Sequence, residues 1–382
     1  MLHYWLVKSQ SNPATDPLLF WFNGGPGCSS LNGLLEGMGP YILSPDKKTL
    51  IRNENNWNKK ASIVYMESPI GVGYSYSLNG NITINDDQTA DANYEAIKLF
   101  LAKFPMFRKS NLYIAGESYS GVYAPMVVDR IIKGQKVFPI NLKGLAIGNG
   151  LMNWNMSIDT TLQFAYGHGI LDEETWQLFS KQCCKGCVAD MLNIAWNSQR
   201  LNPYDYYRDC ETPKRSSILR WMLKHRFPRA QNLNLGQPMS CAPETCTSLP
   251  CIDVRKALHI PTNHSFTWKS CSDDVFKNYI KQYDDMSGFI KTILAAKIPI
   301  TFFYGDTDAV CNYLLGQKFV EGLGLKLIKP KEAWILNGQI GGFETNYNNL
   351  KFLTVRGVGH MLLSWAPVQA EYIFNQFLNN SN

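Results

Sequence analysis

The sequence predicts an α/β fold with a mostly parallel central sheet and helices on both faces of that sheet. Short apolar segments recur along the chain, and helical segments stand between them. Continuous apolar strands that alternate with helices are typical of a parallel sheet buried on both sides. The expected strands are residues 18–22, 62–66, 111–115, 142–147, 299–304 and 352–355.

The remaining elements follow from local patterns. Residues 2–7 alternate as a strand does. A helix is expected over 86–104, because Asp86 and Asp87 suit its first turn and Ala90, Ile97 and Phe100 contribute to an apolar face. A second helix, over 121–133, follows the strand at 111–115.

The chain divides into a core and an insertion. Its 382 residues suffice for one large domain with a sizeable insertion, and a hydrophobic content of 45% supports a true core. The strand pattern stops near residue 152 and resumes near 298. We therefore expect a core made of residues 1–151 and 271–382, with an insertion at 152–270.

The distribution of charge argues against a nucleic-acid partner. The net charge is +6 and the basic residues are scattered. The densest run, from Lys214 to Arg229, contains Trp221, Met222 and Leu223, which is typical of an amphipathic solvated helix. No stretch of about 18 apolar residues occurs, so no membrane span is expected.

Ten cysteines indicate an oxidising compartment. Seven of them fall between Cys183 and Cys251 without zinc-finger spacing, so we expect local disulfides and neither a metal nor a cofactor. No signal peptide follows Met1, and we expect a leader upstream of this sequence; the alternative is a chain that stays inside the cell with reduced cysteines. Four N-x-S/T sequons favour the secretory route: Asn81, Asn155, Asn263 and Asn379.

The segment GESYSG, residues 116–121, is the clearest local signal of function. It reads G-x-S-x-S-G, which is G-x-S-x-G with the second glycine one residue later, and it lies directly after an apolar strand and directly before a helix, which is the context of a nucleophile elbow. Its glycines allow a tight turn that projects Ser118 beside the positive end of the helix. The sequence therefore predicts a serine hydrolase of the α/β-hydrolase fold with Ser118 as nucleophile. The alternative is a structural turn.

His360 is the expected general base. In this fold the catalytic partners follow in the order Ser, acid, His. Of the six histidines only His360 lies near the C-terminus after a strand, in a glycine-rich loop. A capping or buried structural histidine is the alternative. The other histidines are expected at the surface or at helix caps: His3, His168, His225, His259 and His264.

Local sequence pattern leaves more than one candidate for the catalytic acid and identifies only a segment for part of the oxyanion hole. Asp306 and Asp308 both follow the preceding strand; one should orient His360 and the other should be a turn residue. The amide of Tyr119 is one expected oxyanion donor. The glycine-rich turn at 23–27 fits the second, because backbone approaches a substrate closely where side chains are missing. A simple tight turn is the alternative.

Seven motifs stand in register along nearly the whole chain: WFNGGPGCSSLNGLLEGMGPY (21–41), ESPIGVGYSYS (67–77), GESYSGVYAP (116–125), GNGL (148–151), VRKALHIP (254–261), GDTDAVCN (305–312) and GVGHM (357–361). Taken together, they resemble the serine carboxypeptidase family. The resemblance implies a disulfide-rich cap at 152–270 over the active site. It also implies a peptidase that releases C-terminal amino acids at acidic pH through an acyl-enzyme.

The resemblance also implies roles for single residues. It implies Asp308 as the acid, three residues before Cys311, in preference to Asp306. It implies Gly25 and Tyr119 as the oxyanion hole. The catalytic residues implied are therefore Ser118, Asp308 and His360.

Recognition of the substrate's C-terminal carboxylate is implied for Asn23, Gly24 and Glu117. Glu117 can take part when one proton is shared between two acids. The chain departs from the family at a second glutamate, whose position is Gly37 here, while Glu36 lies one place earlier. Either Glu36 reaches in with a local shift or Glu117 acts alone. The residues implied near the leaving amino acid are Asn32 and Met361.

The disulfides implied by the resemblance involve six cysteines, with Cys311 free and buried near the site. Three more cysteines have no implied partner: Cys183, Cys246 and Cys251. The implied pairs are Cys28 with Cys271, Cys184 with Cys187, and Cys210 with Cys241.

The implied partners are peptide substrates, in a lysosomal or secreted setting. Two other functions stay open: an acyltransferase or esterase on the same scaffold, and a protective partner that stabilises other lysosomal hydrolases. Relatives often dimerise, so a homodimer is one expected assembly. Asn23 and Glu117 favour the peptidase, because they suit a peptide that ends in a carboxylate.

Overall fold

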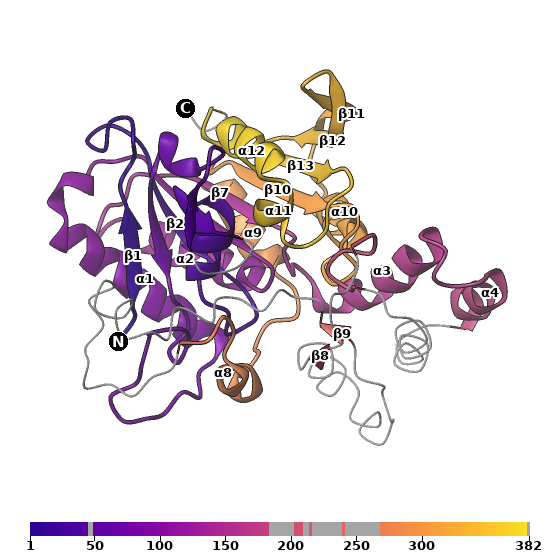
Figure 1. Ribbon diagram of the computed structural model, residues 1–382, viewed down its shortest axis with the longest axis horizontal. Helices are drawn as coiled ribbons and strands as arrows, with labels where there is room; N and C mark the ends of the chain where they lie inside the picture. The colour runs from indigo at the N-terminus through magenta and orange to yellow at the C-terminus, as the bar shows by residue number, and fades with distance from the viewer. Residues whose placement is uncertain (45–48, 183–201, 209–213, 216–238, 241–267, 380–382) are drawn as a thin grey trace.

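A nine-stranded sheet forms the centre of the molecule (Figure 1). The structure is a computed structural model that describes residues 1–44, 49–182, 202–208, 214–215, 239–240 and 268–379. In spatial order the strands are β1 (Tyr4–Val7), β5 (Ser62–Met66), β2 (Leu18–Phe22), β6 (Leu112–Glu117), β7 (Leu142–Gly148), β10 (Ile300–Gly305), β13 (Leu350–Val355), β12 (Gln339–Tyr347) and β11 (Leu327–Leu336).

The six central strands, from β5 to β13, pair in parallel. All six were predicted from their apolar runs, and β1 was predicted from its alternation. β1 pairs antiparallel with β5 at one edge of the sheet. The predicted α/β fold with a mostly parallel sheet is therefore confirmed.

The antiparallel hairpin of β11 and β12 at the other edge was not predicted. Most of β11 is exposed, and it contains Lys329, Pro330, Lys331 and Glu332. Charged residues and proline are tolerated at a sheet edge, where one side of the strand has no partner, but they hide the strand pattern in the sequence. A second small sheet consists of β3 (Tyr41–Leu43) and β4 (Leu50–Arg52).

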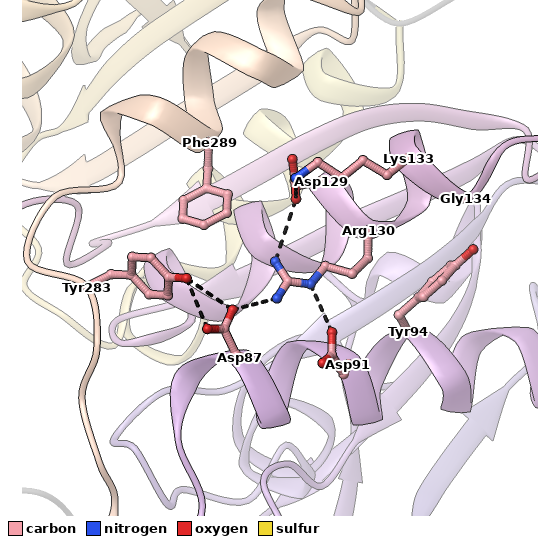
Figure 2. Close-up of a pocket in the computed structure, with 9 residues that line it drawn as sticks. All are labelled: Asp87, Asp91, Tyr94, Asp129, Arg130, Lys133, Gly134, Tyr283 and Phe289. Carbon is pink, nitrogen blue, oxygen red and sulfur yellow. Dashed lines mark hydrogen bonds and ion pairs between the residues drawn. The ribbon is translucent and has the colours of Figure 1, made fainter.

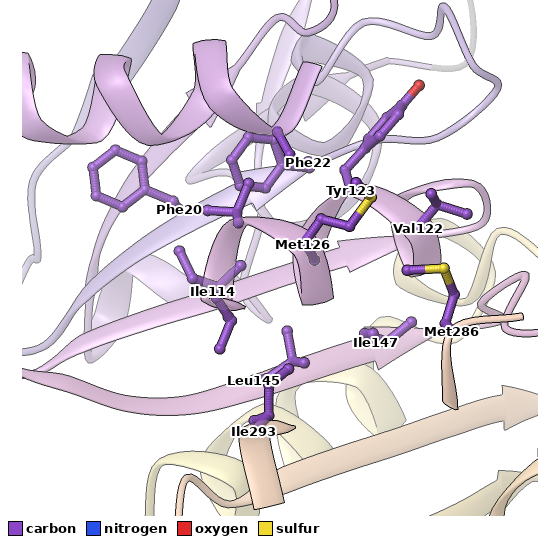
Figure 3. Packing of buried hydrophobic residues seen from close by; sticks show 14 of the residues in the cluster. Phe20, Phe22, Ile114, Val122, Tyr123, Met126, Leu145, Ile147, Met286 and Ile293 are labelled. Atoms are coloured by element: carbon purple, nitrogen blue, oxygen red, sulfur yellow. The ribbon is translucent and has the colours of Figure 1, made fainter. Parts of the chain in front are cut away.

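Four helices cover one face of the sheet. On their outer side, Arg130 of α2 pairs with Asp87 at 2.6 Å and Asp91 at 3.0 Å, both on α1 (Figure 2). Beneath them, Phe20 and Ile114 of the sheet pack in one apolar core with side chains of these helices (Figure 3). The helices are α1 (Asp86–Lys103), α2 (Ser120–Gly134), α9 (Ser287–Ala295) and α10 (Tyr313–Gly322).

The alternate side chains of the same strands form a second core on the opposite face. Trp21 of β2 meets Trp57 edge-on, and Trp57 stacks on Phe374 with ring centroids 4.2 Å apart. Burial of both faces requires the continuous apolar strands seen in the sequence. The covering elements are the π-helix η1 (Gly33–Met38), the 3₁₀ helix η2 (Trp57–Lys59), α11 (Leu362–Trp365) and α12 (Pro367–Asn379).

The chain leaves the sheet after β7. α3 (Trp154–Gly167) packs near α10, and α4 (Glu173–Gln182) lies farther from the sheet (Figure 1). β8 (Lys214–Arg215) and β9 (Met239–Ser240) pair with each other, so the helix expected from Lys214 is wrong at its first two residues. Most of 152–270 lies outside the described residues, and its role as a cap stays a prediction. The chain returns through α8 (Asp273–Asn278).

One predicted disulfide can be examined, and it is present. Cys28 is bonded to Cys271, which ties the glycine-rich turn to the returning chain. Cys311 is free and buried, as the resemblance implied. The other implied pairs lie outside the described residues, as does the sequon at Asn263. The remaining sequon asparagines are exposed: Asn81, Asn155 and Asn379.

Over the residues that are described, no helix is long and apolar enough to cross a membrane.

Candidate active site

Ser118 lies at a sharp turn between β6 and α2. β6 ends at Glu117 and α2 begins at Ser120, so the turn is two residues long. The φ of Ser118 is 64°, in the left-handed region that non-glycine residues seldom adopt. A Cβ on Gly116 would lie 2.1 Å from Ser120 Oγ, so this position needs glycine. The turn has the strained geometry of a nucleophile elbow and leaves Ser118 half-exposed.

His360 and Asp308 form a buried pair. His360 Nδ1 lies 2.6 Å from Asp308 Oδ2, and their side chains are 4% and 0% exposed. Asp308 also accepts hydrogen bonds from Asn149 Nδ2 at 2.9 Å and from the amides of Val310 and Cys311. These donors hold the carboxylate in place, and the carboxylate in turn orients the imidazole.

The protonation of His360 is set by opposing effects. Burial lowers its pKa, because it penalises the imidazolium. The charge of Asp308, the hydrogen bond to it and the charge of Glu117 outweigh burial, and the pKa of His360 is raised above its usual value. The pair is therefore arranged to stabilise a proton on His360, as a general base requires.

Asp306 has a different environment from Asp308. Its Oδ1 accepts a hydrogen bond of 2.7 Å from the amide of Gly357, at the start of the loop that carries His360. Asp306 thus holds loop backbone, and the imidazole pairs with Asp308. The structure distinguishes two aspartates that local sequence pattern had left equivalent.

The Ser118 side chain lowers the pKa of the neighbouring Cys311 thiol, but burial has the larger effect. Burial raises the pKa of that thiol well above its usual value, so Cys311 stays protonated. Among the described residues Ser118 makes no hydrogen bond to His360. Serine–histidine contacts are often loose before substrate binds and tighten in the complex. Cys311 also donates its amide to Asp308, which links the elbow to the acid–base pair.

The glycine-rich turn is packed directly on the elbow. A Cβ on Gly24 would lie 2.5 Å from the amide nitrogen of Tyr119 and 2.6 Å from Ser118 Cβ. Gly25 has φ +113°, which also favours glycine. Tyr119 precedes the first turn of α2, where backbone N–H groups have no partner within the helix. The amides of Gly25 and Tyr119 are thus carried on two segments in contact beside Ser118.

Asn23 and Glu117 are the polar side chains of this contact. Asn23 Oδ1 accepts a hydrogen bond of 2.7 Å from Trp21 Nε1, which leaves the Asn23 amide nitrogen as the group that can donate to a substrate. Burial raises the pKa of Glu117 to about 7, with a smaller rise from Asp308 and a decrease from His360. Glu117 therefore carries its proton on the acidic side of neutrality.

The position of the family's second glutamate is closed in this protein. A Cβ on Gly37 would lie 2.9 Å from Leu363 Cβ, so a larger side chain requires α11 to shift. Glu36 is half-buried. The pKa of Glu117 is raised mainly by burial, lowered by His360 and raised by Asp308.

The two residues implied near the leaving amino acid, Asn32 and Met361, have different surroundings. Asn32 donates its amide to the backbone oxygen and to Oγ of Ser270, at 3.2 and 2.9 Å. Asn32 is therefore engaged in holding the returning chain near the Cys28–Cys271 bond. Met361 follows His360, is half-buried and precedes α11.

A segment of the insertion, residues 202–208, contacts both catalytic loops and was not identified from the sequence. The amide of His360 donates to the Tyr204 oxygen at 2.7 Å, and Thr307 Oγ1 donates to Asp205 Oδ1 at 2.8 Å. A Cβ on Gly359 would lie 1.9 Å from the Tyr204 oxygen. The glycine before His360 is thus needed for close contact with this segment.

Asn149 is a further site residue that the sequence did not reveal as such, although its motif GNGL is one of those that carry the family resemblance. Its φ is +42°, and its side chain reaches Asp308. The signal was an asparagine directly after a parallel strand, where side chains gather at the functional edge of the sheet.

Of the predictions for the other histidines, the one for His168 is confirmed and the one for His3 is wrong. His168 follows α3 as its capping residue, as predicted. The prediction is wrong for His3, whose Nδ1 lies 2.6 Å from the fully buried carboxylate of Glu67. Pairing of β1 with β5 brings the two together, which local pattern does not reveal. The others lie outside the described residues: His225, His259 and His264.

Within the described part of the chain, no group of three or more His, Cys, Asp or Glu side chains could hold a metal ion.

The fold and these contacts define a serine hydrolase of the α/β-hydrolase class. The family model of serine carboxypeptidases matches residues 1–380. The chain belongs to the serine carboxypeptidase family, which makes it a serine-type carboxypeptidase within the hydrolases.

Individual relatives agree with this assignment. Serine carboxypeptidase ctsa-4.1 of Caenorhabditis elegans is 36% identical over 100% of this chain and 87% of its own length. The lysosomal protective protein of Mus musculus is 34% identical over 99% of this chain and 87% of its own. The crystal structure of Kex1(delta)p, a prohormone-processing carboxypeptidase from Saccharomyces cerevisiae, superposes with a TM-score of 0.77 at 22% identity, covering 99% of this chain and 86% of that one. That structure establishes the shared fold.

Proposed function

We propose that this carboxypeptidase uses Ser118, His360 and Asp308 as its catalytic triad and recognises peptides by their C-terminal carboxylate. The observation that carries the proposal is the contact between Gly24 and the elbow. It brings the nucleophile, two backbone N–H donors and the Asn23–Glu117 pair to one place. Such a site holds a peptide by its end, with the last peptide bond at Ser118.

The reaction follows from this arrangement. Ser118 Oγ attacks the last peptide carbonyl and passes its proton to His360, whose imidazolium is stabilised by Asp308. The amides of Gly25 and Tyr119 stabilise the oxyanion. His360 then gives the proton to the leaving nitrogen, and the C–N bond breaks. Water, deprotonated by His360, attacks the resulting ester and restores Ser118.

Carboxylate recognition involves a single acid in this proposal. Glu117 in its protonated form donates to the substrate carboxylate without adding a negative charge. Asn23 and the backbone of Gly24 supply further donors. The closed position at Gly37 supports this reading.

The same groups confine activity to a range of pH. Peptide binding requires protonated Glu117 and weakens above its pKa of about 7. Catalysis requires neutral His360 and weakens below its raised pKa. The activity is therefore proposed to extend to the acidic side of neutrality, with His360 limiting it there. A lysosomal or secreted location suits this range and the Cys28–Cys271 disulfide.

A blocked dipeptide and its C-terminal amide test the proposal, because the scissile bond is the same in both. Just below pH 7, where Glu117 is protonated, we expect the free acid to have a kcat/KM at least about tenfold higher, the effect of one charged hydrogen bond. Equal values would contradict carboxylate recognition. Ser118→Ala should abolish turnover and labelling by a fluorophosphonate. A wild-type protein that neither turns over nor labels would contradict the catalytic assignment.

A further inference from the structure

A buried aspartate lies beneath the nucleophile elbow. Asp86, the first residue of α1, is 0% exposed. Its Oδ1 accepts hydrogen bonds from the hydroxyls of Tyr119 and Tyr279, each at 2.9 Å. Its Oδ2 accepts from the amides of Gln282 at 2.6 Å and Tyr283 at 3.2 Å. All four neighbours donate, so the site suits an acceptor-only carboxylate.

Tyr119 is the important member of this group, because its amide is the proposed oxyanion donor. Its side chain is 2% exposed, and its ring meets those of Tyr123 and Tyr279 edge-on at 5.3 and 5.6 Å. The hydrogen bond from the Tyr119 hydroxyl to Asp86 fixes the far end of the Tyr119 ring, and the rings of Tyr123 and Tyr279 already pack against that ring. With the side chain fixed at both ends, the backbone of Tyr119 has little freedom to rotate.

We propose that Asp86 is a positioning residue for the oxyanion hole. By holding the Tyr119 hydroxyl, it sets the direction of the Tyr119 N–H beside the strained Ser118. The inference rests on the oxyanion role assigned to Tyr119 under the proposed function. A donor that is displaced by a fraction of an ångström stabilises the developing charge less well.

The neighbouring Asp87 holds Asp86 in place from outside. Asp87 pairs with Arg130 of α2 and accepts a hydrogen bond from Tyr283 Oη at 3.0 Å (Figure 2). Its backbone amide donates to the Gln282 side chain at 2.8 Å. The first turn of α1, the helix α2 and the segment 279–283 are therefore joined around Asp86. The shallow pocket of Figure 2 is the outer surface of this junction.

Tyr119→Phe tests the inference, because it removes the hydroxyl and keeps the backbone amide. We expect kcat for a blocked dipeptide to fall about tenfold while KM stays within about twofold. Labelling by a fluorophosphonate should slow by a similar factor, since the phosphoryl oxygen uses the same hole. Tyr166→Phe is the matched control: it removes a tyrosine hydroxyl bonded to a carboxylate outside this group, that of Glu173, and kcat should stay at the wild-type value.

Asp86→Asn completes a double-mutant cycle. If Asp86 acts through Tyr119, the double variant should lose no more kcat than the Tyr119→Phe variant and Asp86→Asn should lose about as much. Losses of kcat that multiply in the double variant would overturn the inference, as would an unchanged labelling rate in Tyr119→Phe or an equal loss of kcat in Tyr166→Phe. A loss confined to KM would do the same.

The rate of labelling by a fluorophosphonate distinguishes a failure of this inference from a failure of the proposed function. A wild-type protein that labels but does not cleave the dipeptide, with about tenfold slower labelling of Tyr119→Phe, would support the inference and contradict the carboxypeptidase proposal. A wild-type protein that cleaves the dipeptide, with unchanged labelling of Tyr119→Phe, would contradict the inference alone. A wild-type protein that does not label would contradict both.

Discussion

The nucleophile side and the histidine side of the active site are held in different ways. Ser118 belongs to one continuous segment, in which β6, the elbow and α2 follow each other directly. His360 and Asp308 are 52 residues apart and lie on loops that follow two different strands. The nucleophile needs a local backbone shape, whereas the acid–base pair needs two loops to meet.

The contacts that bring those loops together come from elsewhere in the chain. Asn149 reaches Asp308 from the end of β7, and Tyr204 and Asp205 of the insertion bind the loops of His360 and Thr307. Residues 204 and 205 therefore also support His360, the proposed catalytic base. Changes on the histidine side should therefore lower kcat even where they are outside the triad.

The largest expected effect is on the histidine side itself. Asp308→Asn removes the charge that orients and stabilises protonated His360, and we expect kcat to fall about 10⁴-fold. Asp306→Asn is the matched control, since among the described residues Asp306 bonds to loop backbone and not to the imidazole, and kcat should change less than about threefold. Steady-state kinetics on a blocked dipeptide measures both, and equal losses would show that the two aspartates are not distinguished as the structure indicates.

Glu117 lies where the two sides meet, and it gives a prediction of pH dependence. Its pKa is raised to about 7 by burial, so it is neutral below that pH and charged above it. The KM for a blocked dipeptide should rise above pH 7, by up to about tenfold per pH unit, as charged Glu117 repels the substrate carboxylate. Glu117→Gln should remove this rise. The C-terminal amide of the same dipeptide should show no rise with either protein; a rise that persists in Glu117→Gln would assign it to another group.

The smallest expected effect tests support from the insertion. Thr307→Val keeps the shape of the side chain and removes its hydrogen bond to Asp205. We expect kcat to fall about two- to fivefold with KM unchanged, which is the effect of one hydrogen bond. Thr354→Val, which removes a hydrogen bond to Phe343 between β12 and β13, is the control and should leave kcat unchanged. Equal kcat values for the two variants would show that the hydrogen bond from Thr307 to residues 202–208 does not support catalysis.

The two sides of the active site differ in how much of each could be predicted from the sequence. The elbow, the central strands and the candidacy of His360 followed from segments of about six residues, because strand, turn and helix preferences act locally. Asp306 and Asp308 could not be separated by position; only the resemblance favoured Asp308, and the structure places it against the imidazole. Asp86 was expected only as a first-turn residue, since its partners lie near residues 119 and 280.

Sequence patterns alone predicted the parallel sheet, the strand–turn–helix around Ser118 and the family, because each depends on periodicity or on short motifs. Tertiary structure decided which groups face one another. It placed Gly24 on the elbow, Asp308 on His360, the segment 202–208 on both loops and His3 on Glu67. The physical reason is that these contacts join residues far apart along the chain, and their partners are chosen by packing and burial rather than by local conformational preference.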